Sequence, residues 1–254
     1  MAIITGLISY YKHEEAAGDT IDSHGSNDGT VDGATYEATG IIDDALSFDG
    51  DNDFISIPST IASQFITINM WVYVNDLGIG NAKFYAHRVR ATNTRIYIMQ
   101  TNTDFCIRVG EIAIQDTGAT LITGWQMLTL TVDNGTWTAF YNGSEEDTGA
   151  YTAFAQYNNV AGIGAYVDGV GAEDSFADAI IDEVGIWSRV LTDTEIEDLY
   201  NSGAGLQYPF TAGLQLNIGD NWKVVEGMQI NIGDDWKEVQ GAQINIGDAW
   251  KEIF

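Results

Sequence analysis

Residues 66–74 carry the most restrictive pattern in the chain, because Ile66, Ile68, Met70, Val72 and Val74 occupy every second position. A period of two residues is typical of a β-strand, whose successive side chains point to opposite faces of a sheet. The intervening side chains are also largely apolar, as expected inside a sandwich or at a ligand-binding face. Further strands are predicted at 46–57, 95–100, 105–110, 125–132, 137–141, 159–163 and 179–187. Tight turns are favoured at Asp49-Gly50, Asn134-Gly135 and Asn142-Gly143. Many short strands with such turns predict an all-β sandwich or barrel.

One helix is predicted near residue 195. Thr192 can cap its first turn, Glu195 can complete a capping box, and Gly203 can end it. Residues 204–212 follow, with Gly205, Pro209 and no charged side chain, and are predicted to be a linker. The sequence thus divides into a domain of residues 1–203, a linker of residues 204–212 and a C-terminal segment.

The C-terminal segment is a repeat of 14 residues, present at 213–226, 227–240 and 241–254. Each copy is predicted to form a β-hairpin, with turns at Gly219-Asp220, Gly233-Asp234 and Gly247-Asp248. Because an isolated hairpin is marginally stable in water, the three hairpins must stack on one another, on the domain or on other copies of the chain. The tryptophans that would form this assembly surface, or alternatively a sugar-binding platform, are Trp222, Trp236 and Trp250.

The excess of acidic residues limits the classes of partner that the chain can bind. Asp and Glu number 37 against 10 Lys and Arg, a formal net charge of −27. Such a chain repels nucleic acid and anionic lipid, so neither is expected as a partner. Membrane insertion is not expected either, since no apolar run approaches the roughly 18 residues of a spanning helix. The one cysteine, Cys106, excludes an intrachain disulfide and is expected to be a small buried side chain.

Two segments resemble the laminin G-like, concanavalin A-like jelly-roll family. The first runs from GLISYYKHEEAAGDTIDSHGSNDGTVDGATY to ALSFDGDNDFISIP, and the second is AIIDEVGIWSRVLTDTEIEDLYNSG. Together they bracket residues 5–203. Two departures from the family pattern are Tyr11-Lys12-His13 and Ala179. The resemblance implies a two-sheet antiparallel jelly roll, followed here by the three hairpin repeats.

The same resemblance implies that the first and last strands meet, with a structural Ca²⁺ near their meeting point. Matched residue by residue, its ligands would come from Asp22, the loop around Asn27, Asp182 and Glu183. Oxygen donors of this kind are those that Ca²⁺ prefers. The alternative is that Asp182 and Glu183 accept hydrogen bonds from loop amides.

Catalysis is not expected. The Glu-x-Asp-x-x-Glu strand motif of glycosidases with this fold is absent, and the acidic run at 195–198 lies on the predicted helix, where positions i and i+2 do not share a face. His13, His24 and His87 are too widely spaced for a zinc or iron motif. We therefore predict a protein that is not an enzyme.

Ligand binding would use aromatic side chains and charged neighbours. The candidate ligand-binding residues are Trp71, Tyr73, Tyr85, Trp137 and Tyr141, of which at least half are expected to belong to the core. A cationic cluster extends from Lys83 to Arg95 and includes Arg88 and Arg90. It could balance nearby carboxylates, or contact an acidic glycan or a partner subunit.

The sequence favours a virion structural protein, such as a head fibre, decoration or tail-associated protein, that displays a glycan- or receptor-binding jelly roll on the virion surface. The hairpin repeats resemble those at the ends of phage structural proteins, and the N-terminus lacks the basic region of a secretion signal. A homo-oligomer, preferably a trimer, other virion proteins and a cell-surface glycan are the expected partners. The alternative is an extracellular carbohydrate-binding or adhesion module of a secreted bacterial protein, although Met1 and Phe254 show no sign of truncation.

Overall fold

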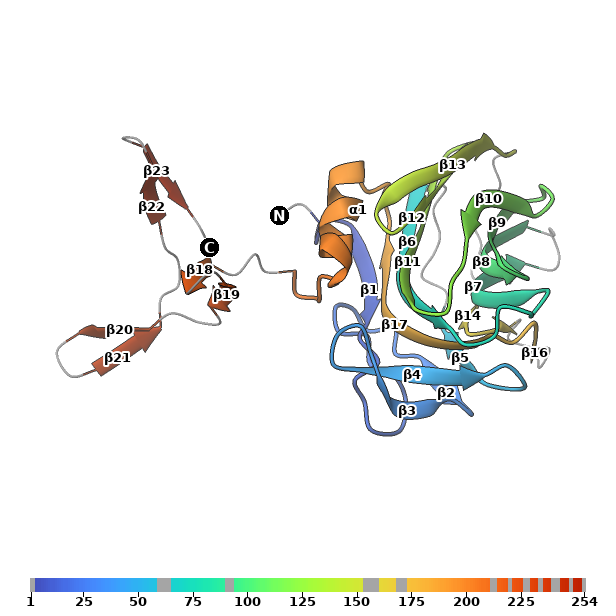
Figure 1. Ribbon diagram of the computed structural model, residues 1–254, viewed down its shortest axis with the longest axis horizontal. Coiled ribbons are helices and arrows are strands. Elements are labelled where there is room, and N and C mark those ends of the chain that lie inside the picture. The colour runs from blue at the N-terminus through green and yellow to red at the C-terminus, as the bar shows by residue number, and fades with distance from the viewer. Residues whose placement is uncertain are drawn as a thin grey trace. The chain divides into compact units, whose positions relative to one another are not determined.

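The computed structural model describes residues 3–58, 65–89, 94–152, 160–167 and 173–210, and six short strands between residues 214 and 252. It divides into two compact units, the domain of residues 2–209 and a unit that holds residues 210–254. The domain is a sandwich of two antiparallel sheets (Figure 1). The jelly-roll sandwich predicted from the sequence is therefore confirmed.

The first sheet has eight strands. Its order is β13 (Ser144–Ala150), β12 (Thr136–Tyr141), β11 (Trp125–Asp133), β6 (Phe65–Val74), β17 (Asp178–Trp187), β4 (Asp44–Asp49) and β3 (Thr35–Thr39), and β1 (Leu7–Tyr11) pairs with β17. Strand β17 pairs with β4 through residues 178–181 and with β1 through residues 184–187. The first and last strands of the domain meet as expected, and Asp182 and Glu183 lie where β17 changes partner.

The second sheet has seven strands. Its order is β10 (Gln115–Thr120), β9 (Asp104–Gly110), β8 (Thr94–Thr101), β7 (Ala82–Val89), β14 (Ala161–Ile163), β5 (Phe54–Ile57) and β2 (Thr30–Asp32). The predicted strand at 46–57 is in fact two strands, β4 and β5, in different sheets. Asp49 is the last residue of β4, and Gly50 directly after it has a φ of 80° that favours glycine. A short pair, β15 (Tyr166–Val167) and β16 (Glu173–Asp174), accompanies the second sheet.

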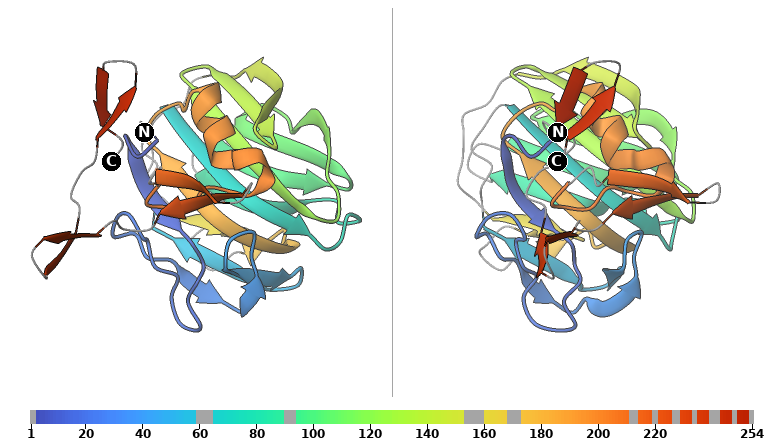
Figure 2. Two further views of the ribbon diagram at one scale, coloured as in Figure 1. Left: turned by 60° about the vertical axis from the view of Figure 1, so that its left-hand side comes forward. Right: turned by 90° about the vertical axis from the view of Figure 1, so that its left-hand side faces the viewer.

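The core lies between the two sheets. Ile66, Ile68, Met70, Val72 and Val74 of β6 are all buried in it, as their alternation predicts. The other face of β6 is buried as well, because helix α1 (Asp193–Tyr200) and the segments beside it cover the outer face of the eight-stranded sheet (Figures 1 and 2). The seven-stranded sheet lies on the far side of the sandwich from α1.

Helix α1 begins as predicted and ends earlier. The Thr192 side chain accepts a hydrogen bond from the Glu195 amide, and the reciprocal bond of the capping box is also present. The helix ends at Tyr200, and its C-cap, Asn201, adopts a left-handed conformation. Gly203 belongs to the 3-10 turn that follows, η1 (Asn201–Gly203). Asparagine tolerates that conformation better than most residues, so Gly203 was the wrong choice of terminator. Within the described residues, no helix is long and apolar enough to cross a membrane.

Most of the predicted linker belongs to the domain, whose compact unit extends to Pro209. The Tyr208 ring lies 5.7 Å from the Tyr10 ring and 5.5 Å from that of His24, measured between centroids. The Gln207 side chain donates hydrogen bonds to Glu14 and Glu183. Glycine and the lack of charge indicated a linker, but aromatic and amide contacts attach residues 204–209 to the sandwich.

Each 14-residue repeat contributes two antiparallel strands, and the Trp of each repeat lies on the second of them. The pairs are β18 (Leu214–Ile218) with β19 (Asn221–Val225), β20 (Gln229–Ile232) with β21 (Asp235–Glu238), and β22 (Gln243–Ile246) with β23 (Ala249–Glu252). The predicted turn dipeptides, and the side chains of Trp222, Trp236 and Trp250, lie outside the described residues. Their role in assembly stays a prediction.

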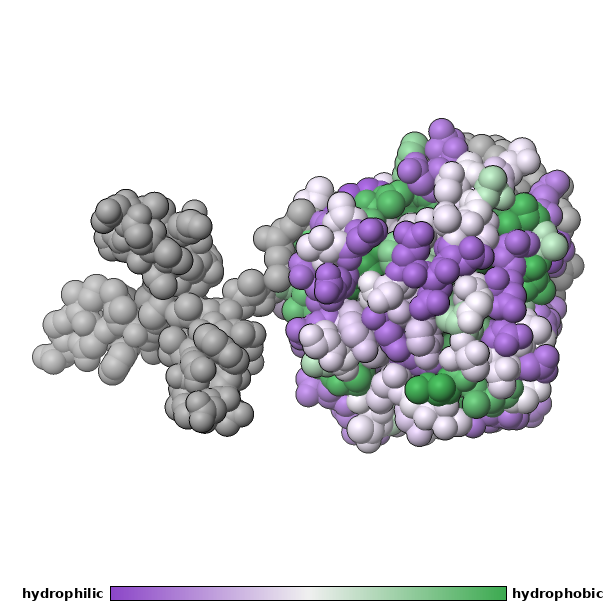
Figure 3. Space-filling view, turned by 45° about the horizontal axis from the view of Figure 1, so that its top comes forward, coloured by the Kyte–Doolittle hydropathy of each residue, from purple (hydrophilic) through white to green (hydrophobic). Residues whose placement is uncertain are grey.

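The surface of the domain is mostly polar. Hydrophilic side chains cover much of the face in Figure 3, with small apolar patches between them. Five large apolar residues of the described part are exposed: Ile4, Ile21, Phe65, Ile114 and Ile122. Among the described residues, a ligand site is therefore better sought in a concavity than on an apolar surface.

Candidate ligand-binding pocket

A cationic surface forms on the outer face of the seven-stranded sheet, where β7, β8 and β9 lie side by side. In β8, Ile96 and Ile98 enter the core, so Arg95, Tyr97 and Met99 point to the other face. The pairing of β7, β8 and β9 then places the outward-facing residues in three rows that cross the strands. They are Arg88–Arg95–Gly110, Ala86–Tyr97–Arg108 and Lys83–Met99–Cys106.

A β-bulge in β7 decides which residues reach this face. Lys83 pairs with Met99 and Tyr85 pairs with Ile98, so Phe84 is the extra residue. Phe84 and Tyr85 both enter the core. Lys83 therefore shares the outer face with Ala86 and Arg88, although simple alternation from Lys83 would place Tyr85 there.

A pocket of about 170 Å³ opens on this face. Strands β7, β8 and β9, the β15–β16 pair and three residues that flank strands contribute to it. Its lining consists of Asn81, Lys83, Arg88, Arg95, Tyr97, Arg108, Ile114, Tyr166, Asp174 and Ser175. Tyr97 and Tyr166 are only 6% and 2% exposed, so charged and amide groups are the main functional groups available to a ligand.

Lys83 is held in the pocket wall by Asn81. Its Nζ lies 2.5 Å from the Asn81 Oδ1 and 3.3 Å from the Asn81 carbonyl oxygen, and 5.2 Å from the centre of the Tyr97 ring. The side chain is 4% exposed, and burial lowers the pKa of Lys83 to about 8, against the opposing effect of the Asp174 charge. A buried ammonium group thus lines the pocket with two of its three hydrogen atoms directed to one residue.

The three arginines lie close enough to affect one another. Arg88 and Arg95 are directly opposite across β7 and β8, and the Arg88 guanidinium lies 5.5 Å from the centre of the Tyr166 ring. The Arg108 Nε donates to the Ile112 carbonyl at 2.8 Å. Burial and the charges of Arg95 and Arg88 lower the pKa of Arg108. These side chains concentrate positive charge in a chain that is otherwise strongly acidic.

The five predicted ligand-binding aromatics lie elsewhere. Tyr85 and Trp137 are buried in the core, and Trp71 is stacked on Tyr200 at 5.7 Å, so none of these three rings is available to a sugar. Tyr73 is half-buried against Trp125 on the outer face of the eight-stranded sheet, and the Tyr141 hydroxyl donates to Gln126. None of the five lines the pocket.

The sequence prediction was more accurate for the cationic cluster than for the aromatic residues. Lys83, Arg88 and Arg95 line the pocket, Arg90 lies outside the described residues, and His87 is buried. The sequence reasoning missed Arg108, Tyr97 and Tyr166. The Arg-flanked aromatic in the run Arg95-Ile96-Tyr97 was the signal that could have suggested the second of them.

Asp22 and Asn27, two of the four predicted calcium ligands, hold the loop that follows β1. The Asp22 carboxylate accepts hydrogen bonds from the amides of Tyr10, His24, Gly25 and Asn27 and from the Asn27 side chain. Burial raises the pKa of Asp22, but these amides outweigh it and the net pKa is lowered. Five donors leave this carboxylate no lone pair for a metal.

Asp182 and Glu183 are also engaged by protein donors. Asp182 accepts from the amides of Ile41, Ile42 and Glu183, as the alternative interpretation expects. Glu183 accepts from the Tyr10 hydroxyl and from Gln207. Within the described residues, no three acidic, histidine or cysteine side chains are grouped to hold a metal. The arrangement therefore does not fit Ca²⁺.

A melting experiment tests the conclusion that Asp22, Asn27, Asp182 and Glu183 do not bind Ca²⁺. Because their oxygens face N–H and O–H donors, we expect the melting temperature of the full chain to agree within about 1 °C in millimolar Ca²⁺, in Mg²⁺ and in chelator. The measurement is circular dichroism during heating. An increase with Ca²⁺ that Mg²⁺ does not reproduce would show that the four residues rearrange into a calcium site after all.

Comparison with known proteins places the fold. The family pattern Laminin_G_3, described as the concanavalin A-like lectin/glucanases superfamily, matches residues 49–197, more than half of the chain. No curated protein sequence matches the chain.

Three solved structures are similar to the domain. Domain 4 of AbnA, an extracellular arabinanase from Geobacillus stearothermophilus in complex with arabinotriose, has a TM-score of 0.61 and 21% identity over 76% of this chain and 97% of that one. Trypanosoma rangeli sialidase in complex with sialic acid has a TM-score of 0.65 and 15% identity, over 80% of this chain and 34% of that one. The binding domain of Paraclostridial Mosquitocidal Protein 1 has a TM-score of 0.63 and 18% identity, over 79% and 53%.

At these identities the similarities show a shared fold, and this chain spans about a third of the sialidase. The family pattern covers strands of both sheets and the first part of helix α1. The chain therefore belongs to the concanavalin A-like lectin/glucanases superfamily, and its domain is a laminin G-like jelly roll.

Proposed function

We propose that the domain is a carbohydrate-binding module whose ligand occupies the pocket formed by β7, β8, β9, β15 and β16. The observation that carries the proposal is the convergence of Lys83, Asn81 and three arginines in one concavity of a lectin-type fold. Such groups donate hydrogen bonds to the oxygens of a sugar. The similar domain of the arabinanase in complex with arabinotriose supports a carbohydrate ligand for this fold.

The proposed module binds without cleaving. Hydrolysis of a glycosidic bond by the usual route needs two carboxyl groups on either side of the bond. Among the described residues that line the pocket, Asp174 is the one carboxylate. The lining thus supports the binding of a sugar, and it offers one of the two carboxyl groups that hydrolysis would need.

Occlusion of the pocket mouth tests the proposed site. Ile114 lines the pocket and is 41% exposed, so Ile114→Trp adds bulk there without disturbing the core. We expect the full chain to bind oligosaccharides on a glycan array, and Ile114→Trp to weaken that binding by roughly tenfold or more. Ile122→Trp is the matched control, since Ile122 is 52% exposed and does not line the pocket. If the two variants bind equally well, the ligand does not occupy this pocket.

We further propose that the repeats assemble the chain into an oligomer that displays the module on a virion surface. Three two-stranded units in one short segment support this, because paired strands without a larger sheet need a partner surface. The second candidate is an adhesion module of a secreted bacterial protein, for which the repeats would be an appendage.

Mass in solution separates these two candidates. We expect the full chain to be a trimer or larger by light scattering, and a shortened chain ending at Pro209 to be a monomer, because hydrogen-bonding edges of the hairpins can pair between copies. A monomeric full chain would exclude the assembly role and favour the adhesion module.

A further inference from the structure

The strongest feature without a structural explanation is the charge of the pocket. Of the chain's ten lysines and arginines, four line this one concavity, in a chain whose formal net charge is −27. Cations of an acidic protein are expected to disperse among its carboxylates, since dispersal lowers the electrostatic energy of the fold. Among the described lining residues, these four cations share one carboxylate, that of Asp174.

The sheet register brings like charges together. Arg88 and Arg95 are directly opposite across two strands. Arg108 lies opposite Tyr97 in the next row, close enough for its pKa to be lowered by both arginines as well as by burial. The register thus gathers cationic side chains on one face of three adjacent strands, where a negatively charged group in the pocket would interact favourably with Lys83 and Arg108.

Lys83 and Arg108 have donor capacity left for such a group. Within the described part of the chain neither side chain forms an ion pair with a carboxylate. The Lys83 ammonium directs two hydrogen atoms to Asn81, and Arg108 uses its Nε on the Ile112 carbonyl. The third hydrogen of Lys83 and the terminal nitrogens of Arg108 are the groups that can reach a ligand.

The aromatic rings of the pocket are too buried to stack on a sugar, so charged groups are the expected basis of ligand binding. Tyr97 and Tyr166 are 6% and 2% exposed, too little for a sugar ring to lie on either face. The volume of about 170 Å³ is small, so it suits one sugar residue or its charged substituent. Guanidinium groups bind planar or tetrahedral oxyanions through paired hydrogen bonds.

We propose that the pocket binds the acidic substituent of a sugar, a carboxylate or a sulfate, and that the module therefore selects anionic over neutral glycans. The proposal rests on the proposed carbohydrate-binding function and adds the ligand's chemical class. Lys83 and Arg108 bind the anion, and the Arg88–Arg95 pair supplies the surrounding positive charge. The acidic exterior of the chain repels long polyanions, so a single acidic residue within a glycan fits better than nucleic acid.

The first experiment compares matched sugars on the full chain. An array carries uronic acid, sialic acid and sulfated oligosaccharides beside the methyl esters or desulfated forms of the same compounds. We expect binding of one or more acidic forms, with at least roughly tenfold weaker binding of its neutral counterpart. The preferred class, carboxylate or sulfate, identifies the anion.

Three other outcomes are equally informative. Equal binding of acidic and neutral forms overturns the anionic selectivity and leaves the carbohydrate-binding function intact. Binding of neutral sugars alone also overturns the anionic selectivity and leaves the carbohydrate-binding function intact. No binding of any sugar, with binding of inorganic sulfate or of an oligonucleotide, overturns both proposals, as does no binding at all.

A second experiment assigns the effect to the pocket. Calorimetry with the best acidic sugar is run on Arg108→Gln, on Arg108→Lys and on Lys12→Gln, a control that removes one positive charge outside the pocket. We expect roughly tenfold weaker binding for Arg108→Gln, partial recovery for Arg108→Lys and no change for Lys12→Gln. Binding by the unaltered chain should also weaken between about 50 and 500 mM NaCl. Equal affinities for all three variants, or no salt dependence, would contradict the proposal.

Discussion

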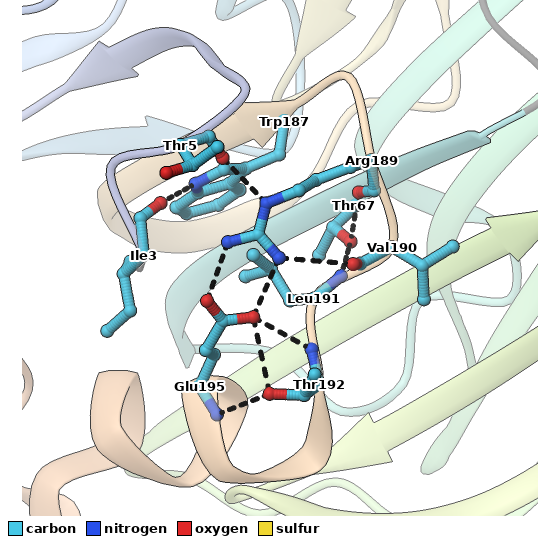
Figure 4. A network of polar contacts seen from close by, with 9 residues as sticks. All are labelled: Ile3, Thr5, Thr67, Trp187, Arg189, Val190, Leu191, Thr192 and Glu195. Atoms are coloured by element: carbon cyan, nitrogen blue, oxygen red, sulfur yellow. Dashed lines mark hydrogen bonds and ion pairs between the residues drawn. The ribbon is translucent and has the colours of Figure 1, made fainter. Parts of the chain in front are cut away.

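Replacing Arg189 by methionine is expected to lower the free energy of unfolding of the domain by about 2–3 kcal/mol. The Arg189 guanidinium forms a two-point ion pair with Glu195, with N–O distances of 2.7 and 2.6 Å (Figure 4). Its Nε also donates to the Thr5 carbonyl at 2.6 Å. The change would leave the Glu195 carboxylate, which is only 10% exposed, without its cation. The expected effect is below that of a fully buried pair, because Arg189 is 26% exposed.

The network explains why one substitution would act on several elements. Glu195 also accepts from the Thr192 amide and hydroxyl at the start of α1, and Thr67 of β6 donates to the Arg189 carbonyl. Arg189 thus ties the segment before β1, strand β6 and the first turn of α1 to one another. Its loss should shift the melting temperature by roughly 5–10 °C for a domain of this size.

Lys12→Met is the matched control for Arg189→Met. Lys12 forms a single contact of 3.9 Å with Glu14, and both side chains are more exposed than Glu195. Surface pairs of this kind contribute about 0–1 kcal/mol, so little change is expected. Adding Glu195→Gln to Arg189→Met should recover part of the loss, because no unpaired carboxylate remains. Equal melting temperatures for Lys12→Met and Arg189→Met would show that the network does not stabilise the fold.

Strands that are apolar on both faces, or in which apolar and polar side chains alternate regularly, could be predicted from the sequence. Residues 66–74, 125–132 and 179–187 correspond to β6, β11 and β17, which lie next to one another in the middle of the eight-stranded sheet. The capping box at Thr192 was equally predictable, because it depends on residues three positions apart. Strand β13 was missed because Ser144–Ala150 lies at the sheet edge and is largely polar and exposed.

The pocket could not be predicted in full, since its residues come together through register. Alternation gives the two faces of a strand but does not give the partner strand or its alignment. The bulge at Phe84 moves Tyr85 into the core while Lys83 stays outside, so simple alternation from Lys83 would give the wrong face for Tyr85. Trp137 is buried for a tertiary reason, because its ring packs over Gly149 of β13.

The domain is also expected to become more stable as the pH falls from about 8 to about 5, through Asp182 and Glu183. Burial and the charge of Glu183 raise the pKa of Asp182 to about 8, and burial raises that of Glu183 to about 7. Both folded-state values lie above the unfolded ones, so the fold favours the protonated carboxyl groups. Their contribution to stability is complete below about pH 4 and is lost as the pH rises through 7 and 8.

Glu183→Gln isolates this effect from the general repulsion among the chain's carboxylates. A glutamine amide can face the Tyr10 oxygen, whose own hydrogen can turn to the Leu206 carbonyl at 3.3 Å, while the glutamine oxygen accepts from Gln207. At about pH 8 the variant should be more stable than the unaltered chain by on the order of 2 kcal/mol, and at about pH 5 the difference should nearly vanish.

The control for Glu183→Gln is Glu145→Gln, which removes the same charge from an exposed side chain of β13 that does not act on Glu183. Lys12, Glu14 and Tyr10 act on Glu183, which also interacts with the Asp182 charge, and only Lys12 among these groups is a cation. If repulsion across the acidic surface caused the pH dependence, both variants would flatten the melting curve against pH to the same degree. A selective effect of Glu183→Gln instead means that a carboxyl group buried where β17 changes partner controls how the sandwich responds to pH. Measurements stay above about pH 5, because the lowered pKa of Asp22 acts in the opposite direction as the pH falls through and below its ordinary value.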